Sequence, residues 1–320
     1  MQKKRIMIVS VICILLLTLC ACGTKKQEKK ADTVDFSSLS KTGSMELNYA
    51  TQYSVDEYGG YKMITIVDDG RFLLIPEGMV VPQNIPEDVT VLQQPLDKTY
   101  LVSTSVMDLV RQIDAMSDIR LSGTKEDGWY VEEAREAMEE GDILYAGKYS
   151  APDYELILDE GCNLAIENTM IYHNPEVKEK LEELGIPVLV ERSSYESHPL
   201  GRLEWIRLYG VLFDKEEEAD SFYEAELEKL EPIMKKESCN VTVAFFSVTA
   251  NGTISVRKSN DYVAQMIALS GGTYVPEQLA SEEENALSTM NIQMEDFYAD
   301  AKNADILISV SYTHLRAHET

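Results

Sequence analysis

The chain has 320 residues, of which 55 are acidic and 29 are basic, so its formal net charge is −26. This length accommodates two lobes of ordinary domain size. So negative a charge excludes nucleic acid as a partner, because phosphate binding needs basic residues, and solubility alone accounts for the acidity.

The first segment has the pattern of a secretory signal. Lys3, Lys4 and Arg5 precede an apolar run over residues 6–19 that only Ser10 and Thr18 interrupt. The run is too short to cross a bilayer comfortably, so the pattern favours a cleaved signal over residues 1–21.

The sequence Leu19-Cys20-Ala21-Cys22 resembles a lipobox, in which an aliphatic and two small residues precede a lipid-accepting cysteine. Cys22 is the expected lipidation site, since bulky Leu19 makes Cys20 a poorer acceptor. An ordinary signal peptide with incidental cysteines is the alternative. Cleavage removes three basic residues and leaves a charge of −29. We therefore expect a lipid-anchored protein on the extracytoplasmic face of the cell membrane.

Residues 22–43 are polar and rich in lysine, with almost nothing to bury. Such a composition cannot offset chain entropy and predicts a flexible tether.

The next sixty residues are strand-rich. Short apolar or alternating runs at 61–67, 71–75 and 89–92 are separated by turn signals such as Asp68-Asp69-Gly70. From residue 100 strands alternate with helices: strands are predicted at 100–102, 142–145, 163–166 and 186–190, and helices at 106–116, 154–160 and 175–184. Repeated strand–helix–strand units of this length predict a parallel sheet with helices on its faces.

A long helical pattern then separates two α/β regions. Residues 203–236 are helical throughout, with Asp214 capping a second segment and Pro232 loosening the last turn. Strands are predicted again at 241–248, 253–256 and 305–310, with helices at 261–270 and 296–301. The expected fold is α/β, with two lobes that each contain a mostly parallel sheet flanked by helices. The predicted boundaries are residues 44–200 for the N-terminal lobe, 201–236 for the bridging helix and 237–310 for the C-terminal lobe.

Two cysteines lie beyond the lipobox, Cys162 and Cys239. They are far apart in sequence, so we expect both to be buried small hydrophobes without a disulfide.

Several motifs stand out along the folded part of the chain: Gly147-Lys148-Tyr149-Ser150-Ala151-Pro152-Asp153-Tyr154-Glu155, Leu184-Gly185-Ile186-Pro187-Val188, Glu196-Ser197-His198-Pro199-Leu200-Gly201-Arg202, Val256-Arg257-Lys258-Ser259 through Gly271-Gly272, and Phe297 to Ile308. As a set they resemble the substrate-binding lipoproteins of ABC importers, in the rigid-helix class (class III) that binds iron-siderophores, haem and cobalamin. The resemblance covers residues 44–310. It implies a monomer without a cofactor or a metal of its own, which holds a metal-chelate solute between its lobes and delivers it to a permease.

The chain departs from that family at its end. The family continues beyond Val310, whereas residues 311–320 show no apolar periodicity and resemble read-through into an adapter sequence. The second lobe is therefore expected to be incomplete.

Other functions have weaker support in the sequence. A surface hydrolase would need a carboxylate pair, but most acidic residues of so acidic a chain are solvated, and no nucleophile elbow or phosphate-binding loop occurs. Direct metal capture needs several histidines, and only His173 and His198 lie in the credible region. A sensory co-receptor with the same fold remains an alternative.

The site can be predicted from topology, because ligands of open α/β sheets meet the loops beyond the carboxyl ends of the strands. Aromatic residues there suit a flat or greasy metal complex, and basic residues suit its carboxylates or phosphates. The candidate ligand-binding residues are Trp129, Lys148, Tyr149, Tyr172, Arg192, Tyr195, Arg257 and Tyr262. Arg257 is expected to contact an anionic group, since it follows a strand and precedes a helix N-terminus.

The resemblance also implies an acidic residue on each lobe that meets arginines of the permease. Glu155 lies eight residues before Asn163, and Glu295 lies eight residues before Asn303, with Asp296 as its neighbour. Stabilisation of the first helical turn is the competing explanation for each carboxylate.

Overall fold

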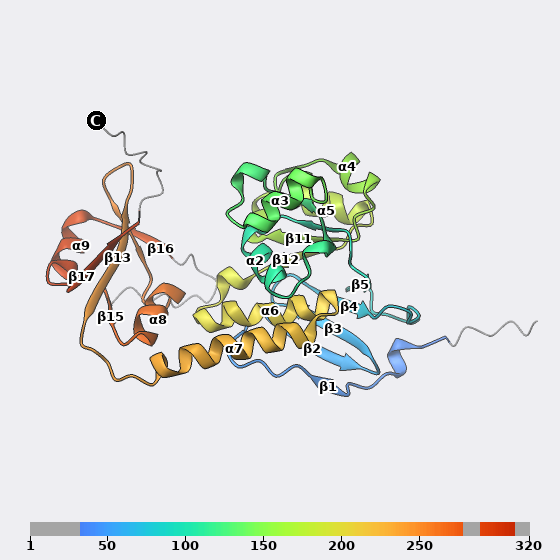
Figure 1. Cartoon of the computed structure of the whole chain (residues 1–320), viewed down its shortest axis with the longest axis horizontal. Coiled ribbons are helices and arrows are strands. Elements are labelled where there is room, and N and C mark those ends of the chain that lie inside the picture. The colour runs from blue at the N-terminus through green and yellow to red at the C-terminus, as the bar shows by residue number, and fades with distance from the viewer. Residues whose placement is uncertain (1–32, 278–288, 311–320) are drawn as a thin grey trace, which may run out of the picture.

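The computed structural model describes residues 33–277 and 289–310 (Figure 1). The predicted signal, the lipidation site, the first half of the tether (residues 22–32) and the terminal tail lie outside these residues. The prediction of a flexible tether is wrong for the second half, because Asp35 caps the short helix η1 (Phe36–Ser38) and Phe36 is buried against the first sheet. Within the described chain, no helix combines the length and apolar character needed to cross a membrane.

The first lobe opens with a five-stranded sheet in the order β1-β2-β3-β4-β5. Its strands are β1 (Gly43–Ser44), β2 (Tyr53–Tyr58), β3 (Tyr61–Ile66), β4 (Gly70–Ile75) and β5 (Val89–Gln93). Neighbouring strands are antiparallel except β4 and β5, so we call the β1–β5 sheet the antiparallel sheet. Both faces are covered: Met63 and Leu73 pack against Phe36, while Ile64 and Phe72 belong to the main core. The strand predictions in this region are confirmed.

The rest of the first lobe is a parallel sheet in the order β12-β11-β6-β7-β8. Its strands are β6 (Thr99–Leu101), β7 (Ile119–Ser122), β8 (Leu144–Tyr145), β11 (Leu164–Asn168) and β12 (Val188–Glu191). The helices are α2 (Thr104–Gln112), α3 (Glu132–Glu140), α4 (Tyr154–Asp159) and α5 (Pro175–Glu183), and a short hairpin joins β9 (Gly147–Lys148) to β10 (Ala151–Pro152). The predicted strand–helix alternation is confirmed, and it brings the carboxyl ends of five strands to one edge.

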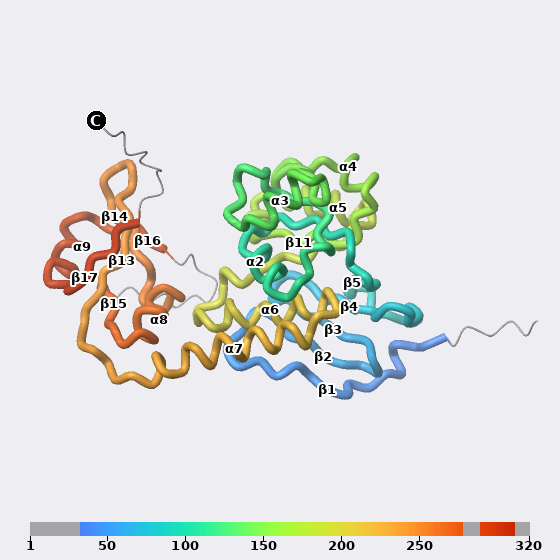
Figure 2. Tube along the Cα trace, in the orientation of Figure 1, coloured from blue at the N-terminus to red at the C-terminus, as the bar shows by residue number. Residues whose placement is uncertain are grey.

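Two helices occupy residues 201–236, with a break at Asp214 as predicted, but Asp214 ends the first helix and Lys215 stands at the N-cap of the second. Helix α6 (Pro199–Phe213) ends at Asp214, whose φ of 57° is left-handed, and α7 (Glu216–Met234) begins two residues later. The helices pack side by side between the two sheets of the first lobe, and α7 leads the chain to the second lobe (Figures 1 and 2). A Cβ at Gly210 would lie 2.6 Å from that of Ala219, so glycine permits this close packing.

The second lobe is a smaller α/β unit. Its strands are β13 (Thr242–Val248), β14 (Ile254–Arg257), β15 (Thr273–Val275), β16 (Thr289–Ile292) and β17 (Ile306–Ser309), with helices α8 (Tyr262–Leu269) and α9 (Met294–Ala301). Strand β13 runs parallel to β15 and β17 and antiparallel to β14, so this sheet is mixed. The predicted α/β class is confirmed, with parallel and antiparallel pairs distributed unevenly among the three five-stranded sheets of the described chain.

The two remaining cysteines are free thiols in different environments. Cys162 is half-buried against the apolar cluster beneath α4 and α5. The prediction that Cys239 is buried is wrong, because this residue lies in the exposed segment between α7 and β13.

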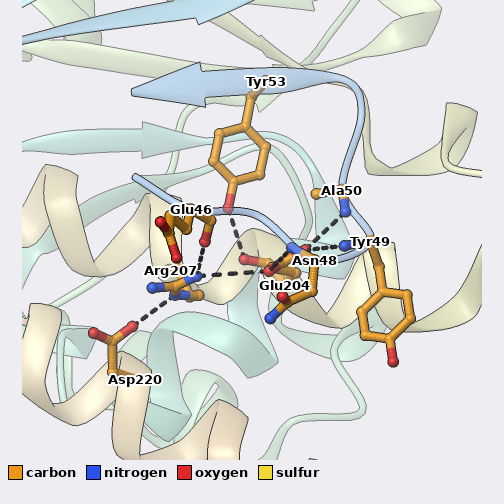
Figure 3. A network of polar contacts seen from close by, with 8 residues as sticks. All are labelled: Glu46, Asn48, Tyr49, Ala50, Tyr53, Glu204, Arg207 and Asp220. Atoms are coloured by element: carbon orange, nitrogen blue, oxygen red, sulfur yellow. Dashed lines mark hydrogen bonds and ion pairs between the residues drawn. The ribbon is translucent and has the colours of Figure 1, made fainter. Parts of the chain in front are cut away.

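Buried carboxylates attach the loop before β2 to helix α6 (Figure 3). Glu204 accepts hydrogen bonds from the main-chain N–H groups of Asn48, Tyr49 and Ala50 at 2.7–2.8 Å. Arg207 lies 3.6 Å from the Glu204 carboxylate and donates to Asp220. One turn of α6 therefore fixes the position of the loop that leads into the antiparallel sheet.

Candidate ligand-binding site

The carboxyl edge of the parallel sheet carries a row of polar and aromatic residues. Ser103 follows β6, Thr124 follows β7, Tyr145 ends β8, and η4 (Thr169–His173) and η5 (Ser193–Tyr195) follow β11 and β12. From the strand order, hydroxyl groups occupy the middle of the edge, and tyrosines with cations lie towards its two ends.

Three of the predicted residues meet at one end of this edge. Arg192 is only 3% exposed and stacks on the Tyr195 ring at 4.4 Å. Its guanidinium donates to the Tyr172 hydroxyl at 3.2 Å and forms an ion pair with Asp68 at 3.4 Å. Arg192 therefore orders both tyrosines and links the two sheets of the lobe. Burial raises the pKa of Tyr172, which stays a neutral phenol.

The other end of the edge pairs a lysine with a tyrosine. The Lys125 ammonium lies 5.5 Å from the centre of the Tyr145 ring. Lys148 is exposed in β9, and Tyr149 is half-buried against the cluster beneath α4. These two candidates lie on the loop that follows β8.

Trp129 lies in the core instead of on this edge. It is 6% exposed and belongs to the main apolar cluster of the first lobe. Its indole N–H donates to the Ser122 hydroxyl at 3.1 Å, so the chain folds back after β7 and turns the ring inward. The two histidines lie elsewhere: His173 is exposed, and His198 caps α6 and stacks on Tyr49 at 4.5 Å.

The second lobe brings Arg257 and Tyr262 together. Arg257 ends β14, and its guanidinium carbon lies 5.4 Å from the Tyr262 ring centre. Asp261 caps α8 by accepting from the Val263 N–H at 3.0 Å, and it lies 3.7 Å from Arg257. The Tyr274 hydroxyl donates to the Arg257 carbonyl at 2.7 Å and fixes the main chain there.

Arg202 joins the two lobes, and the sequence analysis gave it no role. This residue stands near the start of α6, and its guanidinium carbon is 3.5 Å from the Tyr262 ring centre. Arg202 ends the motif that begins at Glu196, but the sequence around it gives no indication of a contact with Tyr262. Glu191 was missed as well: it is buried at the end of β12 and accepts from the Ser103 hydroxyl at 3.1 Å.

Sequence comparison finds relatives that are lipoproteins. No protein-family model matches the chain. An uncharacterized lipoprotein of Methanocaldococcus jannaschii is 24% identical over 277 residues, which are 83% of this chain and 65% of that protein. A second one from the same organism is 25% identical over 302 residues, 90% of this chain and 72% of its own length. The chain thus spans about two thirds of the length of these relatives.

Solved structures decide the fold. A possible iron-binding (periplasmic solute-binding) protein of Staphylococcus epidermidis gives a TM-score of 0.53 at 14% identity, over 68% of this chain and 78% of that one. The periplasmic haem-binding protein of Vibrio cholerae gives 0.53 at 15% identity, over 67% and 76%. The chain has the fold of a class III periplasmic binding protein.

In this binding-protein fold the three acidic candidates are exposed at helix starts. Glu155 lies in the first turn of α4, ahead of β11. Glu295 and Asp296 lie in the first turn of α9, ahead of β17. The predicted positional match between the lobes is present, and the proposed docking role stays a prediction.

Proposed function

We propose that this protein is a lipid-anchored solute-binding protein of an ABC importer. It captures an iron complex (siderophore or haem) or cobalamin between its lobes and delivers the solute to the permease. Cys22 holds it at the extracytoplasmic face of the membrane, and Glu155 with Glu295 or Asp296 docks the lobes on the permease. It carries no catalytic centre in this proposal.

The observation that carries the proposal is the contact of the two lobes beside the carboxyl edge of the parallel sheet. There Arg202, which donates to the Ser194 carbonyl next to Tyr195, lies over the Tyr262 ring of the second lobe, beside Arg257. Tyr172 and Tyr195, which Arg192 orders, lie at the same end of the edge. Phenol rings offer flat apolar surface, and guanidinium groups bind carboxylate or phosphate in a forked geometry. The set suits a planar or greasy complex with anionic groups. The iron and haem named for the two structural neighbours support the same class of solute.

Titration calorimetry of the full chain in detergent against haemin, cyanocobalamin and a panel of ferric siderophores tests the proposal. Saturable one-to-one binding of at least one of them is the expected result. Absence of binding across the whole panel contradicts the proposed solute class, and turnover of any of them contradicts the assignment as a binding protein.

A further inference from the structure

Two arginines from different lobes share one aromatic ring. Arg202 from α6 lies 3.5 Å from the Tyr262 ring centre, and Arg257 from β14 lies 5.4 Å from the same centre. Tyr262 opens α8, which contacts α6. This ring therefore lies beside a cation of each lobe, on the second-lobe side of their contact.

The polar contacts of Arg202 leave its charge without a carboxylate partner. Its guanidinium donates to the main-chain carbonyls of Ser194 at 2.8 Å and Glu196 at 3.4 Å. Among residues 33–277 and 289–310, none forms a salt bridge with it. Burial lowers the pKa of Arg202, the direction expected when a cation loses water.

Two acids of the described chain, Glu191 and Asp261, act on Arg202, and both are engaged with their own loops. Glu191 accepts from the Ser193 N–H at 2.7 Å and from the Ser103 hydroxyl at 3.1 Å. Asp261 accepts from the Val263 N–H, and its contact with Arg257 is long at 3.7 Å. Both carboxylates thus hold loops in place, and within the described chain neither forms a hydrogen bond or an ion pair with Arg202.

We propose that Arg202 and Arg257 bind one carboxylate of the solute from opposite lobes, with Tyr262 as the platform between them. The inference rests on the proposed function and narrows it to carboxylate-bearing complexes, such as haem with its propionates or an iron complex of a polycarboxylate. Neutral hydroxamate complexes and cobalamin lack the required group. Because both lobes hold the same anion, the carboxylate also stabilises the arrangement in which Arg202 covers Tyr262.

The test measures affinity for five probes by calorimetry on the full chain in detergent. Ferric citrate, haemin and metal-free citrate carry carboxylates, whereas ferrioxamine B and cyanocobalamin do not. We expect the carboxylate probes to bind, and Arg202→Gln and Arg257→Gln each to weaken them roughly 10- to 100-fold. Arg71→Gln is the matched control, because Arg71 pairs with Asp88 in the antiparallel sheet at 2.9 Å.

Further variants separate recognition from structure. Tyr262→Phe keeps the ring and should bind as the wild type does, whereas Tyr262→Leu removes the platform and should weaken carboxylate binding. Arg202→Lys keeps the charge without the fork and should fall between wild type and Arg202→Gln. A purely structural role for Arg202 would change the affinities for all probes alike, which overturns the inference.

The remaining outcomes distinguish the two proposals. If ferrioxamine B and ferric citrate bind equally well and Arg202→Gln changes neither affinity, the binding of a carboxylate by Arg202 and Arg257 (the carboxylate clamp) is overturned and the proposed function is left intact. Arginine-dependent binding of citrate without any metal complex supports the clamp and overturns the metal-chelate solute. Failure of all five probes to bind overturns both.

Discussion

Replacing Glu167 with glutamine should remove a large pH dependence from the stability of the first lobe. Glu167 lies in β11, is fully buried, and has no hydrogen-bond partner for either carboxyl oxygen within the described chain. Its neighbour two residues earlier, Ala165, belongs to the apolar cluster beneath α4 and α5. Tyr100 and Tyr154 are the titratable groups whose pKa values its charge raises. Burial raises the pKa of Glu167 from 4.5 to about 8, so at neutral pH the carboxyl group is mostly protonated in the folded state.

The direction in which pH changes the free energy of unfolding depends on which state, folded or unfolded, holds the proton of Glu167. Below pH 4.5 both the folded and the unfolded state are protonated at this residue, so it contributes no pH dependence. Between pH 4.5 and about 8 only the folded state keeps the proton, and the free energy of unfolding falls by about 1.4 kcal/mol per pH unit. Above pH 8 both states are ionised and the loss levels off at about 5 kcal/mol. Glutamine has no such linkage.

Urea unfolding at pH 5.5 and 7.5, followed by tryptophan fluorescence, measures the effect. Both tryptophans of the chain, Trp129 and Trp205, are buried in the core of the first lobe and report on it alone. The wild type should lose about 2.5–3 kcal/mol more than Glu167→Gln over these two pH units. Glu155→Gln, at an exposed position on α4, is the control and should follow the wild type. Parallel pH profiles for wild type and Glu167→Gln would refute the reasoning.

Three further outcomes are expected. Cys22→Ser should move the protein from the membrane to the soluble fraction, and a membrane-bound Cys22→Ser protein of processed size would contradict the anchor. Reversing Glu155 and Glu295 together to lysine should abolish uptake while the purified protein still binds solute, because charges at the rim of an interface control the rate of encounter and the register of docking. Normal transport by this double variant would rule out docking through these residues. Glu204→Ala leaves three main-chain N–H groups without an acceptor and should lower the free energy of unfolding by about 3–5 kcal/mol in urea, whereas a loss below about 1 kcal/mol would mean that water replaces the carboxylate.

Much of the order of elements could be predicted from local patterns, although β7 and α3 were not predicted. The alternation from residue 100 onward places β11 and β12 as short apolar runs between helices, and the structure has them there. The break at Asp214 was predicted, although Asp214 ends α6 instead of capping α7. The side-by-side packing of the two helices depends on Gly210 approaching Ala219 in space, and that contact has no periodic signature in the sequence.

The site was less predictable, because its contacts join distant segments. Tyr172, Arg192 and Tyr195 were found from topology, since parallel strands end at a common edge. Trp129 follows a strand in the same way, but the chain turns back and buries its ring beside Ser122. Arg202, by contrast, was not predicted to belong to the site but lies in it. It stands near the start of a long helix, where a charged residue is usually solvated, and its partner Tyr262 is sixty residues away. The types of residue that follow the strands predict where a site lies. The conformation of each loop decides which of those side chains reach it.

The stretch from Glu191 to Glu204 connects every part of the proposed site. It contains five charged residues, which composition alone would place on a solvated surface. Instead Glu191 holds the loop after β6, Arg192 holds Asp68 of the antiparallel sheet, Glu196 accepts from the N–H groups of residues 51 and 52, and Arg202 reaches the second lobe. Buried charges persist only where specific partners replace water. A single strand–loop–helix segment therefore fixes the carboxyl edge, the antiparallel sheet and the lobe contact relative to one another.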